Sequence, residues 1–94
     1  MNKTQRILMR AAKLIEERGW AQGWFTNKRG CLCMAGAINA VGTGLAEVSN
    51  NDSMEAWHVL FTFLDDNPAN TNDNEYTDPT QAIAALTGAA MMEI

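Results

Sequence analysis

Cys33 and His58 are the two residues of this sequence whose side chains could together perform nucleophilic catalysis. A cysteine at the start of a helix has its thiol pKa lowered by the helix dipole and is activated. His58 is the only histidine, and the residues that could orient its ring are Asp52, Asn72 and Asp73. Against this hypothesis, Cys33 lies in an apolar run, and a buried structural cysteine is inert. A cysteine-dependent hydrolase is therefore the alternative, and the main prediction is a protein without catalytic residues.

A zinc ion is the second chemistry to consider, because Cys31, Cys33 and His58 could supply three ligands. A Cys-x-Cys spacing is shorter than the usual spacing of zinc-binding cysteines, and no fourth ligand is evident. The loop at 65–75 is rich in oxygen ligands, but it lacks the central glycine and the alternating ligand positions of an EF-hand loop. The sequence therefore predicts no metal and no cofactor.

The charged residues are divided unevenly along the chain. The sequence has 94 residues and a formal net charge of −4 at pH 7. Residues 1–29 hold all seven basic residues and two acidic ones, which gives this segment a net charge of +5. Residues 30–94 hold nine acidic residues and neither Lys nor Arg. The negative total argues against nucleic acid as the first choice of partner.

The basic segment still offers a candidate binding surface. Its Lys and Arg residues recur three and four positions apart, which predicts a stripe along one helix face. Aromatic residues follow that could anchor a protein partner or stack on nucleic acid bases. The predicted surface consists of Lys3, Arg6, Arg10, Lys13, Trp20, Trp24, Phe25, Lys28 and Arg29. A cellular protein is the predicted partner, and nucleic acid is the alternative. A third possibility is that this charged face is only exposed to solvent and binds nothing.

The acidic residues provide an alternative surface. An acidic face could imitate nucleic acid and occupy the basic groove of another protein. Its residues would be Asp52, Glu55, Asp65, Asp66, Asp73, Glu75 and Asp78. If this surface binds nothing, its acidic residues would serve only to keep a small protein soluble. The division of charge also permits self-association, either head to tail or as a symmetric homodimer.

The elements that must position these residues are mainly helical. Apolar residues at helical spacing predict a first helix over residues 4–18, with Thr4 or Asn2 as its capping residue and Gly19 as its C-terminal stop. Residues 31–41 contain a single polar side chain. A helix that is apolar on all sides must be buried, so we expect a central helix there that the other segments wrap.

Aromatic residues followed by turn-forming ones predict a short β-hairpin at 22–32, between the first and second helices. The third helix is expected to begin at Asp52 and to end before Pro68, with a buried face of Met54, Trp57, Leu60, Phe61 and Leu64. An acidic loop follows, and Asp78 with Pro79 at the first helical position starts the fourth helix. The predicted fold is a single four-helix domain over residues 1–94.

Cysteine usage and hydropathy indicate the compartment. Cys31 and Cys33 are separated by one residue, so a disulfide between them would be strained, and a reducing, cytoplasmic setting is expected. The N-terminus is not typical of a signal peptide, and no apolar run approaches the length of a membrane span. The sequence therefore predicts no membrane partner.

Three short motifs resemble those of a known family. They are Gly19-Trp20 with Gln22-Gly23 after it, Cys33-Met34-Ala35-Gly36-Ala37, and Asn72-Asp73 followed by Thr77. In these motifs the chain resembles an uncharacterised family of small bacterial and bacteriophage proteins, a domain of unknown function. It departs from the family pattern at Thr71, where relatives usually have Trp, and at Tyr76, where they usually have Arg.

This resemblance implies a compact helical domain and a phage-related origin, and it supplies no established activity. Small phage proteins often bind and modulate a host factor. The sequence also has three Trp, six Met and three Phe, which is a large supply of interface anchors for this length. We therefore predict a non-enzymatic interaction protein that binds and modulates, by inhibition, a host macromolecule.

Overall fold

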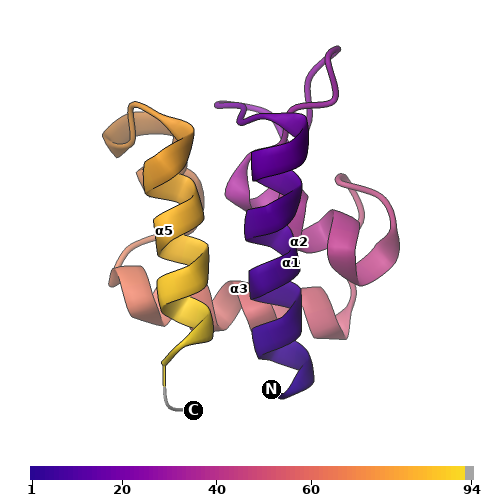
Figure 1. Ribbon diagram of the computed structural model, residues 1–94, viewed down its shortest axis with the longest axis vertical. Helices are drawn as coiled ribbons and strands as arrows, with labels where there is room; N and C mark the ends of the chain where they lie inside the picture. Colours follow the sequence, from indigo (N-terminus) through magenta and orange to yellow (C-terminus); the bar gives the residue numbers. More distant parts are fainter. Residues whose placement is uncertain (93–94) are drawn as a thin grey trace.

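Four helices of ten or more residues make up most of the fold (Figure 1). In the computed structural model, which describes residues 1–92, they are α1 (Lys3–Arg18), α2 (Met34–Thr43), α3 (Asn51–Leu64) and α5 (Pro79–Ala90). Helices α1 and α5 lie side by side, and α3 crosses behind them (Figure 1). The mainly helical fold class is confirmed. No helix within residues 1–92 combines the length and the apolarity needed to cross a lipid bilayer.

The segment predicted to be an acidic loop also contains helical structure. Pro68–Asn70 form the short helix α4, which the π-helical turn η1 (Thr71–Glu75) continues. The side chain of Asn67 accepts a hydrogen bond from the N–H of Ala69 (2.9 Å), and Pro68 is buried at the first helical position. The prediction of four helices was therefore too low, because a cap and a proline start a helix in a stretch whose composition is typical of a loop.

The predicted β-hairpin at 22–32 is not formed. Between α1 and α2 the described chain has only isolated bridges, which pair Leu32 with Trp20 and with Thr26. The side-chain oxygen of Asn27 accepts hydrogen bonds from the N–H groups of Arg29 (2.9 Å) and Cys31 (3.1 Å). These local bonds compete with the cross-strand bonds of a hairpin ladder, so the segment remains irregular.

The beginnings of α1 and α5 agree with the sequence prediction. The side chain of Asn2 accepts from the N–H of Gln5 (2.8 Å), and the side chain of Gln5 accepts from the N–H of Asn2 (2.9 Å). Asp78 accepts from the N–H of Gln81 (3.3 Å), with Pro79 at the first helical position. Both caps lie within four residues of sequence, which is why the sequence predicts them.

The predicted cap of α3 was wrong. Asn50, not Asp52, caps this helix, and it exchanges hydrogen bonds of 2.8 Å with Ser53 in both directions. The amide of Asn50 also donates to the carbonyl oxygen of Gly42 (2.9 Å), which fixes it beside the end of α2. The carboxylate of Asp52 instead forms an ion pair with Lys3 (3.4 Å). Contacts with distant elements therefore decide between two acceptable capping residues.

The core is built around α1, which packs on α2, α3 and α5. Only the first half of α2, Met34–Ile38, is buried, and residues 39–43 are half-buried. The prediction that the other segments wrap residues 31–41 is therefore wrong for its second half, and α1 has the central place. The buried hydrophobic residues of α1 are Ile7, Leu8, Ala11, Ala12 and Ile15.

The predicted buried face of α3 was wrong in part. Leu60 is buried as expected, but Met54 is 50% exposed and Phe61 is 42% exposed. Ser53 and Ala56 face the core with Leu60 instead, at helical spacing. A face of small residues permits a close approach of neighbouring helices. Because Ser53 and Ala56 occupy this face, the larger side chains of Met54 and Phe61 lie at the surface.

Candidate functional site

Asn72 joins three segments that are far apart in the sequence. It is 1% exposed, and its side-chain oxygen accepts hydrogen bonds from Nε1 of Trp20 (2.7 Å) and from the N–H of Met34 (3.2 Å). Its Nδ2 donates to the carbonyl oxygen of Ala21 (3.0 Å) and to Oδ1 of Asp73 (2.8 Å). The amide therefore binds the segment after α1, the start of α2 and η1 together.

Gln22 and Asp73 add further bonds between the same segments. Nε2 of Gln22 donates to the carbonyl oxygens of Asn72 (3.1 Å), Asp73 (3.3 Å) and Tyr76 (2.9 Å). In return, Oδ1 of Asp73 accepts from the N–H of Gly23 (2.8 Å). Residues 20–23 have no regular secondary structure, but they are held against η1 by hydrogen bonds to both its backbone and its side chains.

Cys33 is the N-cap residue of α2. Its Sγ accepts a hydrogen bond from the N–H of Gly36 (3.2 Å), and the side chain is buried. Burial raises the pKa of the Cys33 thiol, and the negative charge of Asp73 raises it further, against the lowering effect of the backbone hydrogen bonds. The thiol is therefore protonated at neutral pH, so the expected activation by the helix dipole is outweighed.

His58 lies apart from this site. It is exposed on α3 and does not line the hollow that Cys33 lines. Within residues 1–92 no group of three or more His, Cys, Asp or Glu side chains is placed to hold a metal ion. The structure thus brings Cys33, Asn72 and Asp73 together and leaves His58 outside.

Two adjoining hollows lie beside this hydrogen-bonded network. The first has a volume of about 480 Å³ and is lined by Gly23, Trp24, Phe25, Thr26, Cys33, Ala35, Glu47, Ala69, Asn72 and Asp73. The second has a volume of about 390 Å³ and is lined by Phe25, Ala35, Asn39, Ser49, Ser53, Met54, Trp57, Asn67 and Ala69. Because they share Phe25, Ala35 and Ala69, we call the two hollows together the groove.

Gly36 allows the wall of the groove to form. A Cβ atom at Gly36 would overlap the carbonyl oxygen of Phe25, so only glycine permits this close approach. The same carbonyl oxygen accepts from the N–H of Cys33 (3.4 Å). The backbone at Phe25 therefore lies directly on the first turn of α2.

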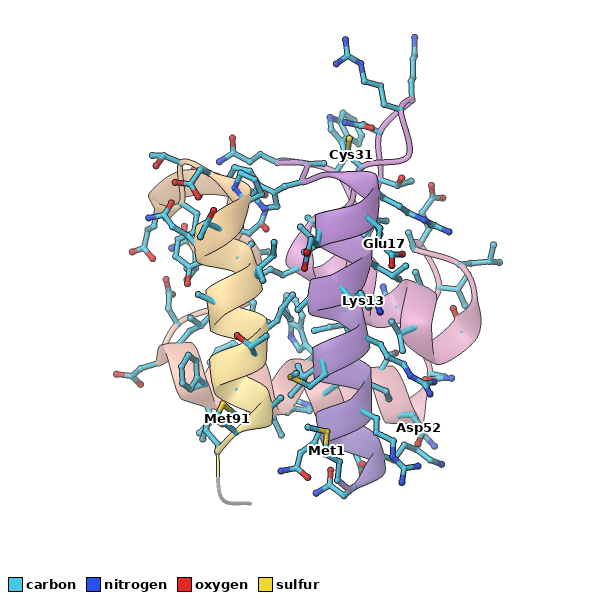
Figure 2. All side chains as sticks on the ribbon, in the orientation of Figure 1. Met1, Lys13, Glu17, Cys31, Asp52 and Met91 are labelled. Atoms are coloured by element: carbon cyan, nitrogen blue, oxygen red, sulfur yellow. The ribbon has the colours of Figure 1, made fainter. Side chains whose placement is uncertain are left out.

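The nine residues of the predicted basic and aromatic surface do not form one patch. Lys3, Arg6, Arg10 and Lys13 are exposed along α1, whereas Lys28 and Arg29 are in the turn next to Cys31. Figure 2 shows Met1 and Cys31 at opposite ends of the molecule, with Lys13 and Glu17 between them. The stripe therefore runs along α1 from its N-terminal end, whereas the turn lies beyond its C-terminal end.

The aromatic residues of that surface also separate. Trp20 is half-buried and its indole N–H is bonded to Asn72, so it is part of the internal network. Trp24 is 74% exposed and Phe25 is 46% exposed, and both line the groove. Only these two aromatic residues of the prediction are therefore available to a partner.

The predicted acidic surface is divided as well. Asp66 accepts hydrogen bonds from Nδ2 of Asn70 (2.9 Å) and from the N–H of Asn67 (2.8 Å), which lower its pKa. Asp73 and Asp78 also accept hydrogen bonds from the backbone, and Asp52 pairs with Lys3 at the end of the molecule where Met1 lies (Figure 2). The acidic residues left exposed and outside these contacts are Glu55, Asp65 and Glu75.

Comparison with models of protein families shows which family the chain belongs to. The model of a family of unknown function (DUF6197) matches residues 1–91. The chain belongs to this family. Comparison with curated proteins and with solved structures found no match. The family match spans all three segments that meet at Asn72, and the predicted membership of a family of unknown function is confirmed.

Sequence reasoning missed several residues of the site. Glu47 lines the groove from a loop that carries no recognisable motif, Ala69 lines it from α4 in a segment predicted to be a loop, and Gln22 was noted only as part of a resemblance. The only indication of this site in the sequence was the set of motif residues around Trp20, Cys33 and Asn72. They are spread over more than fifty positions of the sequence, and the pattern contains no indication that they touch.

Proposed function

We propose that the protein is a small non-enzymatic interaction module, which binds a segment of a host protein in the groove and thereby inhibits that protein. The observation that supports this proposal is the groove, whose two parts have volumes of about 480 and 390 Å³. Each part lies within the size range of ordinary binding sites, and the two parts adjoin at Phe25, Ala35 and Ala69.

The side chains that line the groove are those that anchor protein interfaces. Trp24 is 74% exposed at one end, and Trp57 and Met54 line the other end. Tryptophan is enriched among the residues that dominate binding energy, and methionine adapts to irregular surfaces. Phe25 belongs to both hollows, so a bound segment would contact aromatic rings along its length.

The rim of the groove is held in place before any partner binds. The N–H of Gly23 is bonded to Asp73, and the carbonyl oxygen of Phe25 is bonded to the N–H of Cys33. Trp24 lies between these two anchored residues. A surface that is already ordered loses little conformational entropy on association, which favours binding.

The placement of Cys33 supports a non-enzymatic role. A nucleophile requires a thiolate and a base within hydrogen-bonding distance. The thiol of Cys33 has a raised pKa, and His58 is exposed on another part of the surface. The cysteine-dependent alternative would need both conditions to change on substrate binding.

Affinity capture from host lysate tests the proposal when three proteins are compared. The wild type should retain a partner that Trp24→Ala loses, since truncation of a Trp that anchors an interface costs about 2 kcal/mol or more. Leu45→Ala is the matched control, because Leu45 is 62% exposed and does not line the groove. Equal recovery of the partner by Trp24→Ala and the wild type would refute binding in the groove.

Nucleic acid binding by α1 is the second candidate function. Arg6, Arg10 and Lys13 are exposed along one helix, and among the basic residues of the stripe only Lys3 forms an ion pair within residues 1–92. A mobility-shift assay at several salt concentrations decides, because phosphate contacts give a steep salt dependence. Charge reversal at Arg6, Arg10 and Lys13 should abolish such a shift and leave capture by the groove unchanged.

A further inference from the structure

We propose that the end of the groove lined by Glu47 and Asp73 binds a cationic side chain of the partner, and that a guanidinium group fits it best. The inference rests on the proposed function, because this side chain would belong to the segment that the groove binds. It adds the chemical class of the partner: a segment with an arginine next to apolar residues.

The first argument is the charge of this hollow. Its lining includes two carboxylates, of Glu47 and Asp73, and contains no Lys, Arg or His. Lys28, from the segment between α1 and α2, lines a neighbouring hollow with Glu47 and Trp24, and no ion pair joins it to Glu47 in the described part of the chain. A concave site with one sign of charge concentrates its field on ligands of the opposite sign.

The second argument is the fixed orientation of the Asp73 carboxylate. Its Oδ1 accepts from the N–H of Gly23 and from Nδ2 of Asn72, both at 2.8 Å. Its Oδ2 has no hydrogen-bond partner within residues 1–92. The side chain is half-buried and lines the hollow. A bound cation would therefore meet an oriented acceptor at little further cost in side-chain entropy.

The third argument is the apolar remainder of the hollow. Trp24 and Phe25 provide aromatic surface, and Ala35 and Ala69 provide aliphatic surface. A planar guanidinium stacks on an aromatic ring while its N–H groups bond to a carboxylate, and its methylene stem covers apolar surface. An ammonium group pairs with the carboxylate but stacks less well. The lining therefore favours arginine over lysine.

Binding of N-acetyl-arginine N-methylamide, followed by NMR, tests the inference. The amide signal of Gly23 and the indole signal of Trp24 should shift saturably, with a Kd on the order of 1 mM for a ligand of this size. N-acetyl-citrulline N-methylamide has the same shape without the charge, and it should bind at least about tenfold more weakly. No saturable shift with the arginine probe, or equal binding of both probes, would overturn the inference.

Asp73→Asn is the matching variant of the protein, because it removes the charge and retains an oxygen that can accept from Gly23 and Asn72. It should weaken the arginine probe about tenfold or more. Asp65→Asn, which removes an exposed charge outside the groove, should leave the affinity unchanged. An unchanged affinity in Asp73→Asn with a native amide spectrum would assign the probe to another site.

The two proposals can fail separately. If Trp24→Ala loses the captured partner and Asp73→Asn retains it fully, the groove binds a partner and the cationic contact is wrong. If the arginine probe binds as expected but Trp24→Ala captures the partner as well as the wild type does, the hollow binds cations and the partner uses another surface. Lys28→Ala should not weaken the probe, and a weaker affinity in that variant would contradict the role of the two carboxylates.

Discussion

Replacement of Asn72 by alanine should destabilise the fold severely, because this one side chain makes four hydrogen bonds. Alanine leaves the indole N–H of Trp20, the N–H of Met34 and the carbonyl oxygen of Ala21 without these partners. A buried polar group that loses its partner costs about 1–3 kcal/mol. The adjoining hollow admits water, so the lower value applies to each group, and the expected loss is about 3 kcal/mol.

This loss is large for a domain of this length, whose total stability is on the order of 5–14 kcal/mol. Urea denaturation followed by tryptophan fluorescence measures it directly, and the melting temperature should fall by roughly 12 °C or more. Asn74→Ala is the control, because Asn74 is exposed and bonds only to Asn70, and it should change stability by less than about 0.5 kcal/mol. If Asn72→Ala unfolds within about 1 kcal/mol of the wild type, the network does not hold the three segments together.

Gly36→Ala should lower stability by about 2 kcal/mol or more and displace the segment at Phe25, since the new methyl group overlaps a backbone carbonyl oxygen; the amide spectrum of residues 23–27 and thermal unfolding report both effects. Iodoacetamide should alkylate Cys33 far more slowly than a free thiol near pH 7, and the rate should rise steeply only above the ordinary thiol pKa. Rapid alkylation of Cys33 itself, as distinct from the more exposed Cys31, in the native protein at pH 7 would restore the hydrolase hypothesis. Because the folded-state pKa of Cys33 is raised, the folded protein holds its thiol proton more tightly than the unfolded chain does. Stability from this residue should therefore be complete below about pH 9 and decline as the pH rises further, and Cys33→Ala should lack that decline in a denaturation series.

The sequence predicted those features that depend on neighbouring residues. The start of α5 at Asp78 and Pro79 was correct, and Asn2, one of the two predicted capping residues, caps α1, since these hydrogen bonds close within a few positions. Helix α1 was correct because its apolar residues follow one unambiguous face. Local pattern alone is enough for these elements.

Features that depend on distant contacts were predicted poorly. The cap of α3 was assigned to Asp52 because the sequence does not show that Gly42 binds Asn50. The buried face of α3 was misplaced because tight packing favours Ser53 and Ala56 over larger apolar residues. Hydrophobicity identifies a helix face only when a neighbour leaves room for large side chains.

The candidate site could be predicted only in part. Trp24 and Phe25 were expected at a binding surface, and they do line the groove. The stripe on α1 was expected to continue into this surface, but Lys28 and Arg29 lie in the turn next to Cys31, which is at the opposite end of the molecule from Met1. The wall at Gly36 depends on a backbone contact across eleven residues, and no pattern of residue types indicates it.

The single amide side chain at the junction of three segments also has a dynamic consequence. No sheet connects these segments in the described chain, so displacing residues 20–23 from the surface removes hydrogen-bond partners from Asn72 and Asp73 at the same time. Such a unit opens cooperatively, and its amide protons exchange with solvent at similar rates. The indole N–H of Trp20, which is bonded to Asn72, should therefore report any displacement of the neighbouring rim.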